Sequence, residues 1–355
     1  MNPRIIISKD LGAELTTAIN ECEHDRIFVL TDTNTEKYCL PIFQAALTSS
    51  PFKGEIERVC IPSSDLSKTL DSVSHVWQEL QKGGATRHSL LINLGGGMVT
   101  DLGGFAASTF KRGINFINIP TTLLSMVDAS VGGKTGFNFG GLKNEIGVFN
   151  DPHCVIISTK FLETLDTENI RSGYAEMLKH GLINREGRAM FEELISFDIA
   201  SPDLAQLARM VGESVAVKEK IVIEDPLEHG IRKALNVGHT IGHAFESWAM
   251  RHDCPILHGY AVAFGMVAEL YLACVKMGFP QDVMRQTVYY IKEVYGTLPI
   301  TCDDYPELLE LMTHDKKNTA GIINFTLLGG IGDIHINQTA TKEEIMEAMD
   351  FFREG

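Results

Sequence analysis

Three histidines and one glutamate have side chains and spacings that could hold a metal ion. His239 and His243 are four residues apart in NVGHTIGHAFE, so on a helix they would share one face. His258 follows in ILHGY, and Glu176 precedes both segments in GYAEMLK. Two imidazoles and a carboxylate with one open position are typical of a catalytic zinc site. Helix capping is the alternative for any single histidine, but the cluster favours a metal, and the lack of HExxH argues against a metalloprotease of that kind.

A glycine-rich turn could bind phosphate groups. The segment LGGGMVTDLGGF, residues 94–105, follows an apolar run and opens a predicted helix. Glycines there let a phosphate approach the backbone N–H groups at a helix N-terminus. The segment lacks the GxGxxG fingerprint, and helix–strand packing can itself require glycine. These residues alone are compatible with both nucleotide binding and packing.

A second segment, DASVGGKT, imitates a phosphate-binding P-loop. The P-loop pattern is GxxxxGK[ST], but Asp128 occupies the first glycine position here. An acidic side chain at that point would repel the phosphates that the loop must wrap. We therefore exclude a P-loop kinase or ATPase, and keep Lys134 as an anion ligand because the glycines beside it bring the backbone close.

The overall charge restricts the class of partner. The 355 residues include 31 basic and 46 acidic ones, a formal net charge of −15 that disfavours nucleic acid and anionic membranes as partners. Basic residues nevertheless gather around the motifs, namely Lys143, Lys179, Lys218, Arg232, Lys316 and Lys317. They suit a small anionic substrate, with ordinary solvated surface as the alternative. Seven scattered cysteines without a CxxC pair favour a reduced, cytoplasmic location.

The elements that must position these residues differ between the two halves of the chain. In the first half, β-rich runs alternate with helical periodicity, which predicts βαβ units and a largely parallel sheet. The predicted strands are Arg4–Ser8, Ile27–Thr31, Ile56–Ile61, Ser89–Leu94, Phe116–Ile119 and Val155–Ser158. In the second half, apolar residues three and four apart predict helices, followed by two strand-like runs. The predicted helices are Leu204–Ile223, Ala234–Met250, Tyr260–Met277 and Asp282–Tyr295.

Taken together, the motifs resemble the 3-dehydroquinate synthase family of sugar phosphate cyclases. The resemblance runs from about Thr31 to Gly332. It implies an NAD-binding α/β domain with a Rossmann-like parallel sheet over residues 1–160. A mostly α-helical domain for metal and substrate, residues 161–355, would follow. It also implies a homodimer. The segments that carry it are GGGMVTDLGGF, IPTTLLSMVDASVGGKTGFN, LKNEIGVF, GYAEMLK, ALNVGHTIGHAFE and LHGYAVAFGM.

The resemblance also implies a role for individual residues. The metal ligands, for Zn or Co, would be Glu176, His239 and His258. The NAD positions would be Asp32, Asn34, Asp65, Lys68, Gly95, Gly96, Gly97, Asp101, Thr121, Thr122, Lys134, Lys143, Phe161 and Thr164. The substrate positions would be Asp128, Lys134, Asn144, Lys179, Lys218, Arg232, Asn236, His243 and one of Lys316 and Lys317, while Arg112 would reach the neighbouring subunit's site. One departure is Ser64–Asp65, where the family commonly has Gly-Glu.

The implied reaction converts 3-deoxy-arabino-heptulosonate 7-phosphate to 3-dehydroquinate and phosphate. It begins with hydride transfer from a metal-held hydroxyl of the substrate to NAD, which acidifies the neighbouring C–H. Phosphate is then eliminated, the hydride returns, the ring opens, and an intramolecular aldol step closes the carbocycle. NAD is unchanged overall.

Three other functions compete with this interpretation. A metal-dependent polyol dehydrogenase would release NADH, but a neutral polyol does not require so many anion-binding residues. A sister cyclase would act on a sugar phosphate without a carboxylate, whereas Lys218 and Arg232 together favour a carboxylate, with Arg232 suited to a bidentate contact. A non-catalytic NAD-binding regulator would not need the metal-like group.

Overall fold

The structure is a computed structural model that describes residues 3–140, 142–313 and 322–355. The chain forms two compact units. Unit 1 comprises Met1–Asp166 with Asp203–Val215, and unit 2 comprises Thr167–Pro202 with Ala216–Gly355. The assignment of NAD binding to residues 1–160 and of metal binding to 161–355 stays a prediction.

Unit 1 contains a six-stranded parallel sheet in the order β1-β8-β5-β4-β2-β3. Each strand coincides within a residue or two with a predicted one, so the predicted parallel sheet is confirmed. The strands are β1 (Arg4–Ile7), β2 (Ile27–Asp32), β3 (Glu57–Ile61), β4 (Leu90–Gly95), β5 (Asn115–Pro120) and β8 (Cys154–Ile157). β2 and β4 are buried along their whole length, as expected of parallel strands covered on both faces.

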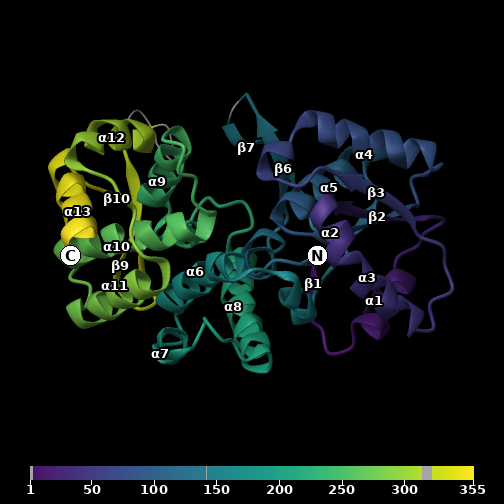
Figure 1. The fold of residues 1–355 in the computed structure, drawn as a ribbon, viewed down its shortest axis with the longest axis horizontal. Coiled ribbons are helices and arrows are strands. Elements are labelled where there is room, and N and C mark those ends of the chain that lie inside the picture. Colours follow the sequence, from purple (N-terminus) through teal and green to yellow (C-terminus); the bar gives the residue numbers. More distant parts are fainter. Residues whose placement is uncertain (1–2, 141, 314–321) are drawn as a thin grey trace. The chain divides into compact units, whose positions relative to one another are not determined.

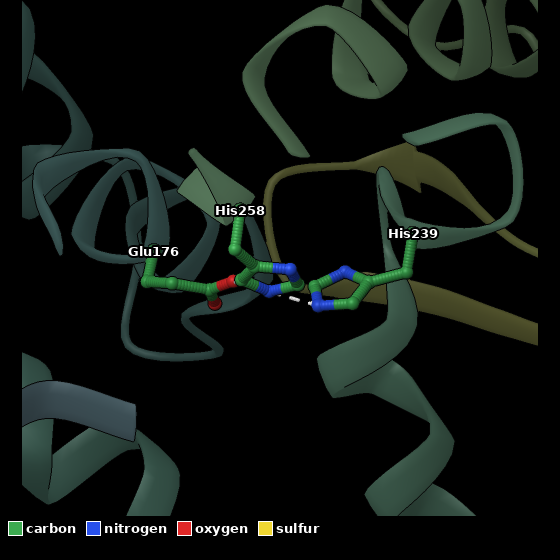
Figure 2. Close-up of side chains that lie close together, drawn as sticks. All are labelled: Glu176, His239 and His258. Carbon is green, nitrogen blue, oxygen red and sulfur yellow. Dashed lines mark ion pairs between the residues drawn. The ribbon is translucent and has the colours of Figure 1, made fainter. Parts of the chain in front are cut away.

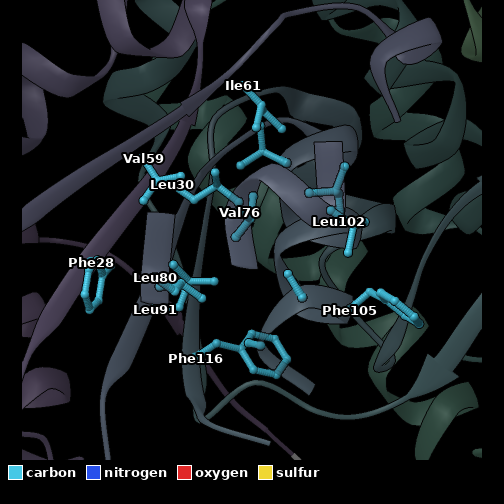
Figure 3. Packing of buried hydrophobic residues seen from close by; sticks show 14 of the residues in the cluster. Phe28, Leu30, Val59, Ile61, Val76, Leu80, Leu91, Leu102, Phe105 and Phe116 are labelled. Carbon is cyan, nitrogen blue, oxygen red and sulfur yellow. The ribbon is translucent and has the colours of Figure 1, made fainter. Parts of the chain in front are cut away.

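Helices connect these strands, as parallel strands require. They are α1 (Leu11–Glu21), α2 (Thr33–Tyr38), α3 (Leu40–Thr48), α4 (Leu70–Lys82) and α5 (Gly97–Thr109), with short helical segments η1 (Asp65–Ser67), η2 (Phe110–Arg112), η3 (Ser125–Ala129) and η4 (Thr159–Thr164). A core between the sheet and α4 and α5 fixes this side of the unit (Figures 1 and 3). Its fully buried members include Leu30, Val76, Leu80, Leu91 and Leu102.

An antiparallel hairpin in unit 1 was not predicted. It pairs β6 (Lys134–Phe139) with β7 (Leu142–Phe149), and Gly136 lies opposite Gly147. A Cβ on Gly136 would lie 2.4 Å from the carbonyl oxygen of Ile146, so the close approach requires glycine. Most of β7 is exposed, and its sequence therefore lacks the apolar run by which the other strands were recognised.

Unit 2 is mostly helical, as predicted. Its helices are α6 (Thr167–Ile183), α7 (Ala189–Ser196), α9 (His239–Arg251), α10 (His258–Met277), α11 (Gln281–Tyr295), α12 (Tyr305–Thr313) and α13 (Lys342–Glu354), while the residues of α8 (Leu204–Glu224) are shared between the units. Short helical segments η5 (Ile231–Asn236) and η6 (Cys302–Asp304) and the antiparallel pair β9 (Asn324–Gly330) and β10 (Asp333–Thr339) complete it. α10 is long and apolar enough to cross a membrane by length and composition, but 67% of its most apolar window is buried within the protein.

The predicted continuous helix Ala234–Met250 is wrong. The segment begins as the 3-10 helix η5 and breaks at Gly238, whose φ of +78° places it in the left-handed region, before α9 starts at His239. A Cβ on Gly238 would also lie 2.8 Å from the carbonyl oxygen of Val262. Glycine is therefore required both for its φ and for the close approach of α10.

Candidate active site

The three predicted metal ligands come together in unit 2. Glu176 lies in α6, while His239 and His258 are the first residues of α9 and α10 (Figure 2). Nε2 of His239 lies 3.4 Å from Oε1 of Glu176, and Nε2 of His258 lies 3.5 Å from the same oxygen. One donor atom from each residue lies within 4.8 Å of the other two. Residues from three helices, distant in the sequence, therefore converge on one point.

Close helix packing produces this convergence. A Cβ on Gly265 of α10 would lie 2.0 Å from the carbonyl oxygen of Gly238 and 2.6 Å from the amide nitrogen of Gly242 in α9. A Cβ on Gly259 would collide with the backbone of Ser172 in α6. Glu269 of α10 accepts hydrogen bonds from the N–H groups of Gly238 and Ile241 at the start of α9. These contacts fix the two helix N-termini that carry the histidines.

Lys179, which the resemblance assigned to the substrate, forms an ion pair with Glu176, the carboxylate predicted to bind the metal. Its Nζ donates to Oε2 of Glu176 one helical turn away, and both side chains are buried. Burial alone would raise the pKa of Glu176, but Lys179 and the nearby His258 outweigh it and hold this pKa well below the usual range. Glu176 is therefore ionised, as a metal ligand must be.

His258 lies between two carboxylates. Burial lowers its pKa, but the adjacent carboxylates of Glu176 and Glu246 outweigh burial and raise the pKa to about 10. Without a metal, the site thus accumulates negative charge that a proton on this imidazole neutralises. A divalent cation could take the place of that proton.

The residues present fit a divalent metal such as zinc or cobalt. Oε1 of Glu176 is buried and accepts no hydrogen bond from the residues that the structure describes, although two imidazole nitrogens face it. The two imidazole nitrogens, 3.4 and 3.5 Å away, face this oxygen as ion pairs without hydrogen-bond geometry, so the imidazoles do not satisfy it themselves. Two nitrogens and one carboxylate oxygen are a common catalytic zinc donor set.

Of the other predicted residues of unit 2 that the structure describes, His243 lies beside this group. The His243 ring lies 5.3 Å from that of His239, which agrees with the predicted shared helix face. Arg232 is buried and donates to the carbonyl oxygen of Pro226. Lys218 is buried in α8. The predicted positions Lys316 and Lys317 lie outside the described residues.

Two acidic residues of unit 2 were missed as site candidates. Glu228 accepts a hydrogen bond from Nδ2 of Asn236 at 3.0 Å, and its φ of +61° is unusual for a non-glycine residue. Glu246 lies 3.5 Å from Nδ1 of His258. Glu246 ends the motif ALNVGHTIGHAFE, so its position two turns after His239 was a usable signal.

The predicted nucleotide residues of unit 1 form a hydrogen-bonded group. Nζ of the buried Lys68 lies 2.6 Å from Oδ2 of Asp101 and also donates to Oδ1 of Asn144. Nζ of Lys143 lies 3.4 Å from Oδ2 of Asp65. Asn144, assigned to substrate by resemblance, is therefore hydrogen-bonded to Lys68, which is assigned to NAD and which also pairs with Asp101.

The glycine-rich turn leads into α5 without a side-chain cap. Gly96, which has no side chain, is the N-cap residue, so it offers no side-chain acceptor to the first N–H groups of α5. Thr121 N–H donates to the carbonyl oxygen of Gly95, which fixes the adjoining segment. A Cβ on Gly95 would lie 2.5 Å from the Val99 side chain. Packing thus requires one of these glycines, while the helix N-terminus keeps the features of an anion site.

Several other residues of unit 1 that were predicted to bind NAD make hydrogen bonds within their own local segments. Asp32 caps α2 by accepting from the N–H groups of Asn34 and Thr35. Thr122 Oγ1 accepts from the N–H of Ser125 at the start of η3. In η4, Thr164 donates to the carbonyl oxygen of the buried Phe161.

The P-loop-like segment has no P-loop structure. Asp128 lies in η3, a π-helical turn, and Lys134 is an exposed residue that begins β6. A P-loop would connect a strand to a helix, so its exclusion agrees with the structure.

Two further predicted residues of unit 1 lie at helix ends. Arg112 is exposed at the end of η2, with a φ of +72°. Gly97 follows the N-cap of α5.

Comparison with known proteins supplies the family. The 3-dehydroquinate synthase N-terminal family matches residues 58–172, and the 3-dehydroquinate synthase C-terminal family matches residues 173–318. A 3-dehydroquinate synthase of Parabacteroides distasonis is 54% identical over 354 residues, which cover 99% of this chain and 98% of that protein.

Solved structures share the fold. A 2-deoxy-scyllo-inosose synthase complexed with carbaglucose-6-phosphate, NAD+ and Co2+ has a TM-score of 0.82 and 23% identity, with 99% of this chain and 96% of that one covered. A 2-epi-5-epi-valiolone synthase of Streptomyces hygroscopicus with NAD+ and Zn2+ bound has a TM-score of 0.81 and 24% identity, with coverages of 100% and 97%. The predicted fold class is confirmed. By its sequence along nearly its whole length, the chain belongs to the 3-dehydroquinate synthase family.

Proposed function

We propose that this chain is a 3-dehydroquinate synthase that uses NAD and a divalent metal, Zn or Co. It converts 3-deoxy-arabino-heptulosonate 7-phosphate to 3-dehydroquinate and phosphate, which makes it a phosphate-eliminating carbon–oxygen lyase. The observation that carries the proposal is the convergence of Glu176, His239 and His258 on one buried point. Family membership supports it, as do the NAD+ and the Co2+ or Zn2+ bound in the related cyclase structures.

Glu176, His239 and His258 would hold the metal. When bound, the metal supplies Lewis-acid stabilisation of a developing alkoxide, and NAD supplies a reversible hydride acceptor. Lys179 keeps Glu176 ionised by its buried ion pair. His243, whose ring lies 5.9 Å from that of His258, is our candidate for moving a proton at a substrate hydroxyl.

The cationic and amide side chains would orient the substrate. Arg232 and Lys218 would bind the carboxylate, since a guanidinium offers two parallel N–H donors. Phosphate would be bound by Lys134, Asn144, Asn236 and Arg112 of a second subunit. In this structure Asn144 is hydrogen-bonded to Lys68, and Asn236 is hydrogen-bonded to Glu228. A bound phosphate would therefore replace these hydrogen bonds with its own.

The protein would act as a cytoplasmic homodimer. Its seven free cysteines support a reducing compartment. Exposed apolar side chains on the hairpin β6–β7 support association through unit 1. They are Phe139, Leu142, Val148 and Phe149, exposed by between 37% and 56%.

Measurement of phosphate release together with NADH absorbance tests the proposed reaction. With substrate and catalytic NAD, phosphate should appear in step with product while NADH does not accumulate, because the redox change is internal. NADH that grows with each turnover would instead identify a dehydrogenase. Turnover of a sugar phosphate without a carboxylate, in preference to the acid, would identify a sister cyclase.

A further inference from the structure

We propose that Glu246 is a positioning residue that orients His258 toward the metal. The inference rests on the proposed metal-dependent function and adds a residue to it. Glu246 is a largely buried side chain of α9 whose Oε2 lies 3.5 Å from Nδ1 of His258. On the opposite side of the same ring, Nε2 faces Oε1 of Glu176. The His258 imidazole thus lies between two carboxylates: Glu176, which would also bind the metal, and Glu246, which would not.

The second histidine has the same arrangement with a different acceptor. Nδ1 of His239 lies 3.1 Å from the carbonyl oxygen of Val237, and its Nε2 faces Glu176. Both rings therefore present Nε2 to the metal position and Nδ1 to an acceptor. An acceptor at Nδ1 selects the tautomer that carries its proton there, which leaves the Nε2 lone pair for the metal.

The two acceptors are not equivalent. The carbonyl of Val237 belongs to the backbone that enters α9, so His239 is oriented by its own local chain. His258 starts α10, and its acceptor comes from the neighbouring helix α9. Glu246 lies seven residues after His239, two turns along the same helix face. One helix thus supplies a metal ligand and, two turns later, the carboxylate that orients another.

A carboxylate at this point should also strengthen the metal bond. An acidic acceptor at Nδ1 raises the basicity of the imidazole, and loss of such a partner typically lowers metal affinity by about 10- to 100-fold. A competing role for Glu246 is direct ligation of a second ion, because His243, Glu246 and His258 also lie close enough to share one. The two roles predict different metal stoichiometries.

The test measures metal affinity of the full-length protein by competition between Zn²⁺ or Co²⁺ and a chromophoric chelator. Glu246→Ala should bind one metal ion about 10- to 100-fold more weakly than wild type. Glu246→Gln should lose less, because its amide oxygen can still accept from Nδ1, and its Co²⁺ absorption spectrum should shift. A matched control is Glu307→Gln, which removes a carboxylate 3.0 Å from His252 on the surface of the same unit. It should leave both affinity and spectrum unchanged.

Thermal unfolding of the metal-free variants separates positioning from folding. A merely structural role would lower the unfolding temperature and leave the affinity of the folded protein intact, which would overturn the inference. Unchanged affinity in both Glu246 variants would overturn it too, as would two metal ions in wild type with one lost in Glu246→Gln. If wild type turns over but neither Glu246 variant differs from it, only this inference fails. If wild type binds no metal, the proposed function fails as well.

Discussion

The candidate metal-binding group of unit 2 (Glu176, Lys179, His239 and His258) and the candidate nucleotide-binding group of unit 1 (Asp65, Lys68, Asp101 and Lys143) hold their charged residues in different ways. Glu176 and Lys179 lie inside helix α6 with side chains 0% and 1% exposed. In unit 1, Lys143 and Asp65 pair at the surface with side chains 45% and 54% exposed, on a hairpin and a short 3-10 helix. Helix packing fixes the first group before any ligand arrives, whereas the second consists partly of bonds that a ligand can exchange. Loss of the buried ion pair in the first should therefore lower stability as well as metal binding, whereas substitutions in the second should mainly affect ligand binding.

The largest expected effect is loss of a metal ligand. His239→Ala or His258→Ala should lower turnover by about a thousandfold or more, because the metal contributes several kcal/mol of transition-state stabilisation. Metal content of the purified variants, by elemental analysis, should fall sharply while the circular dichroism spectrum is kept. Full metal occupancy in both variants would contradict the assignment of these ligands.

The next effect compares two buried lysines that pair with carboxylates, namely Lys179 with Glu176 in unit 2 and Lys68 with Asp101 in unit 1. Lys179→Met should lower the free energy of unfolding of the metal-free protein by about 3–5 kcal/mol, since it removes the buried lysine that pairs with the Glu176 carboxylate. Lys68→Met should cost less, because the side chain of its partner Asp101 is 18% exposed and water can solvate it. Urea denaturation of the two variants measures the difference. Equal losses would remove the distinction between the two regions.

A smaller effect should reveal how the substrate's carboxylate is recognised. Arg232→Lys keeps the charge but loses the two parallel N–H donors, and a charge-assisted hydrogen bond contributes roughly 1.5–3 kcal/mol, so KM for the acid should rise about tenfold or more. Removal of the carboxylate from the substrate should then harm wild type much more than the variant. If both proteins lose equally, Arg232 does not bind the carboxylate, and the preference for dehydroquinate over a sister cyclase loses its main support.

The smallest effect concerns backbone strain next to the nucleotide group. Ser64 has a φ of +106°, in a region that favours glycine. Ser64→Gly should raise the free energy of unfolding by about 1 kcal/mol, because relief of strain exceeds the greater chain entropy of glycine and the loss of the Ser64 Oγ bond to Leu66 N–H. Denaturant unfolding measures this change. A destabilised variant would mean that the serine side chain matters more than the strain.

Local pattern determined much of the molecule from the sequence. Six apolar-rich runs of unit 1 became the six parallel strands, and the interior strands β2 and β4 are buried along their whole length, as strands covered on both faces must be. The spacing of His239 and His243 placed both rings on one face of α9. The hairpin β6–β7 was not predicted, because the sequence of a mostly exposed strand such as β7 contains no continuous apolar run.

Only the tertiary structure decided which side chains meet. Spacing along a helix shows that His239 and His243 share a face, but not which of them faces Glu176. That depends on the helix break at Gly238, on the close approach of α9 and α10 through glycines, and on Glu269 at the start of α9. The pairing of Glu246 with His258 depends on the same packing. Periodicity is a property of one element, whereas a site built from three helices requires contacts between residues far apart in the chain.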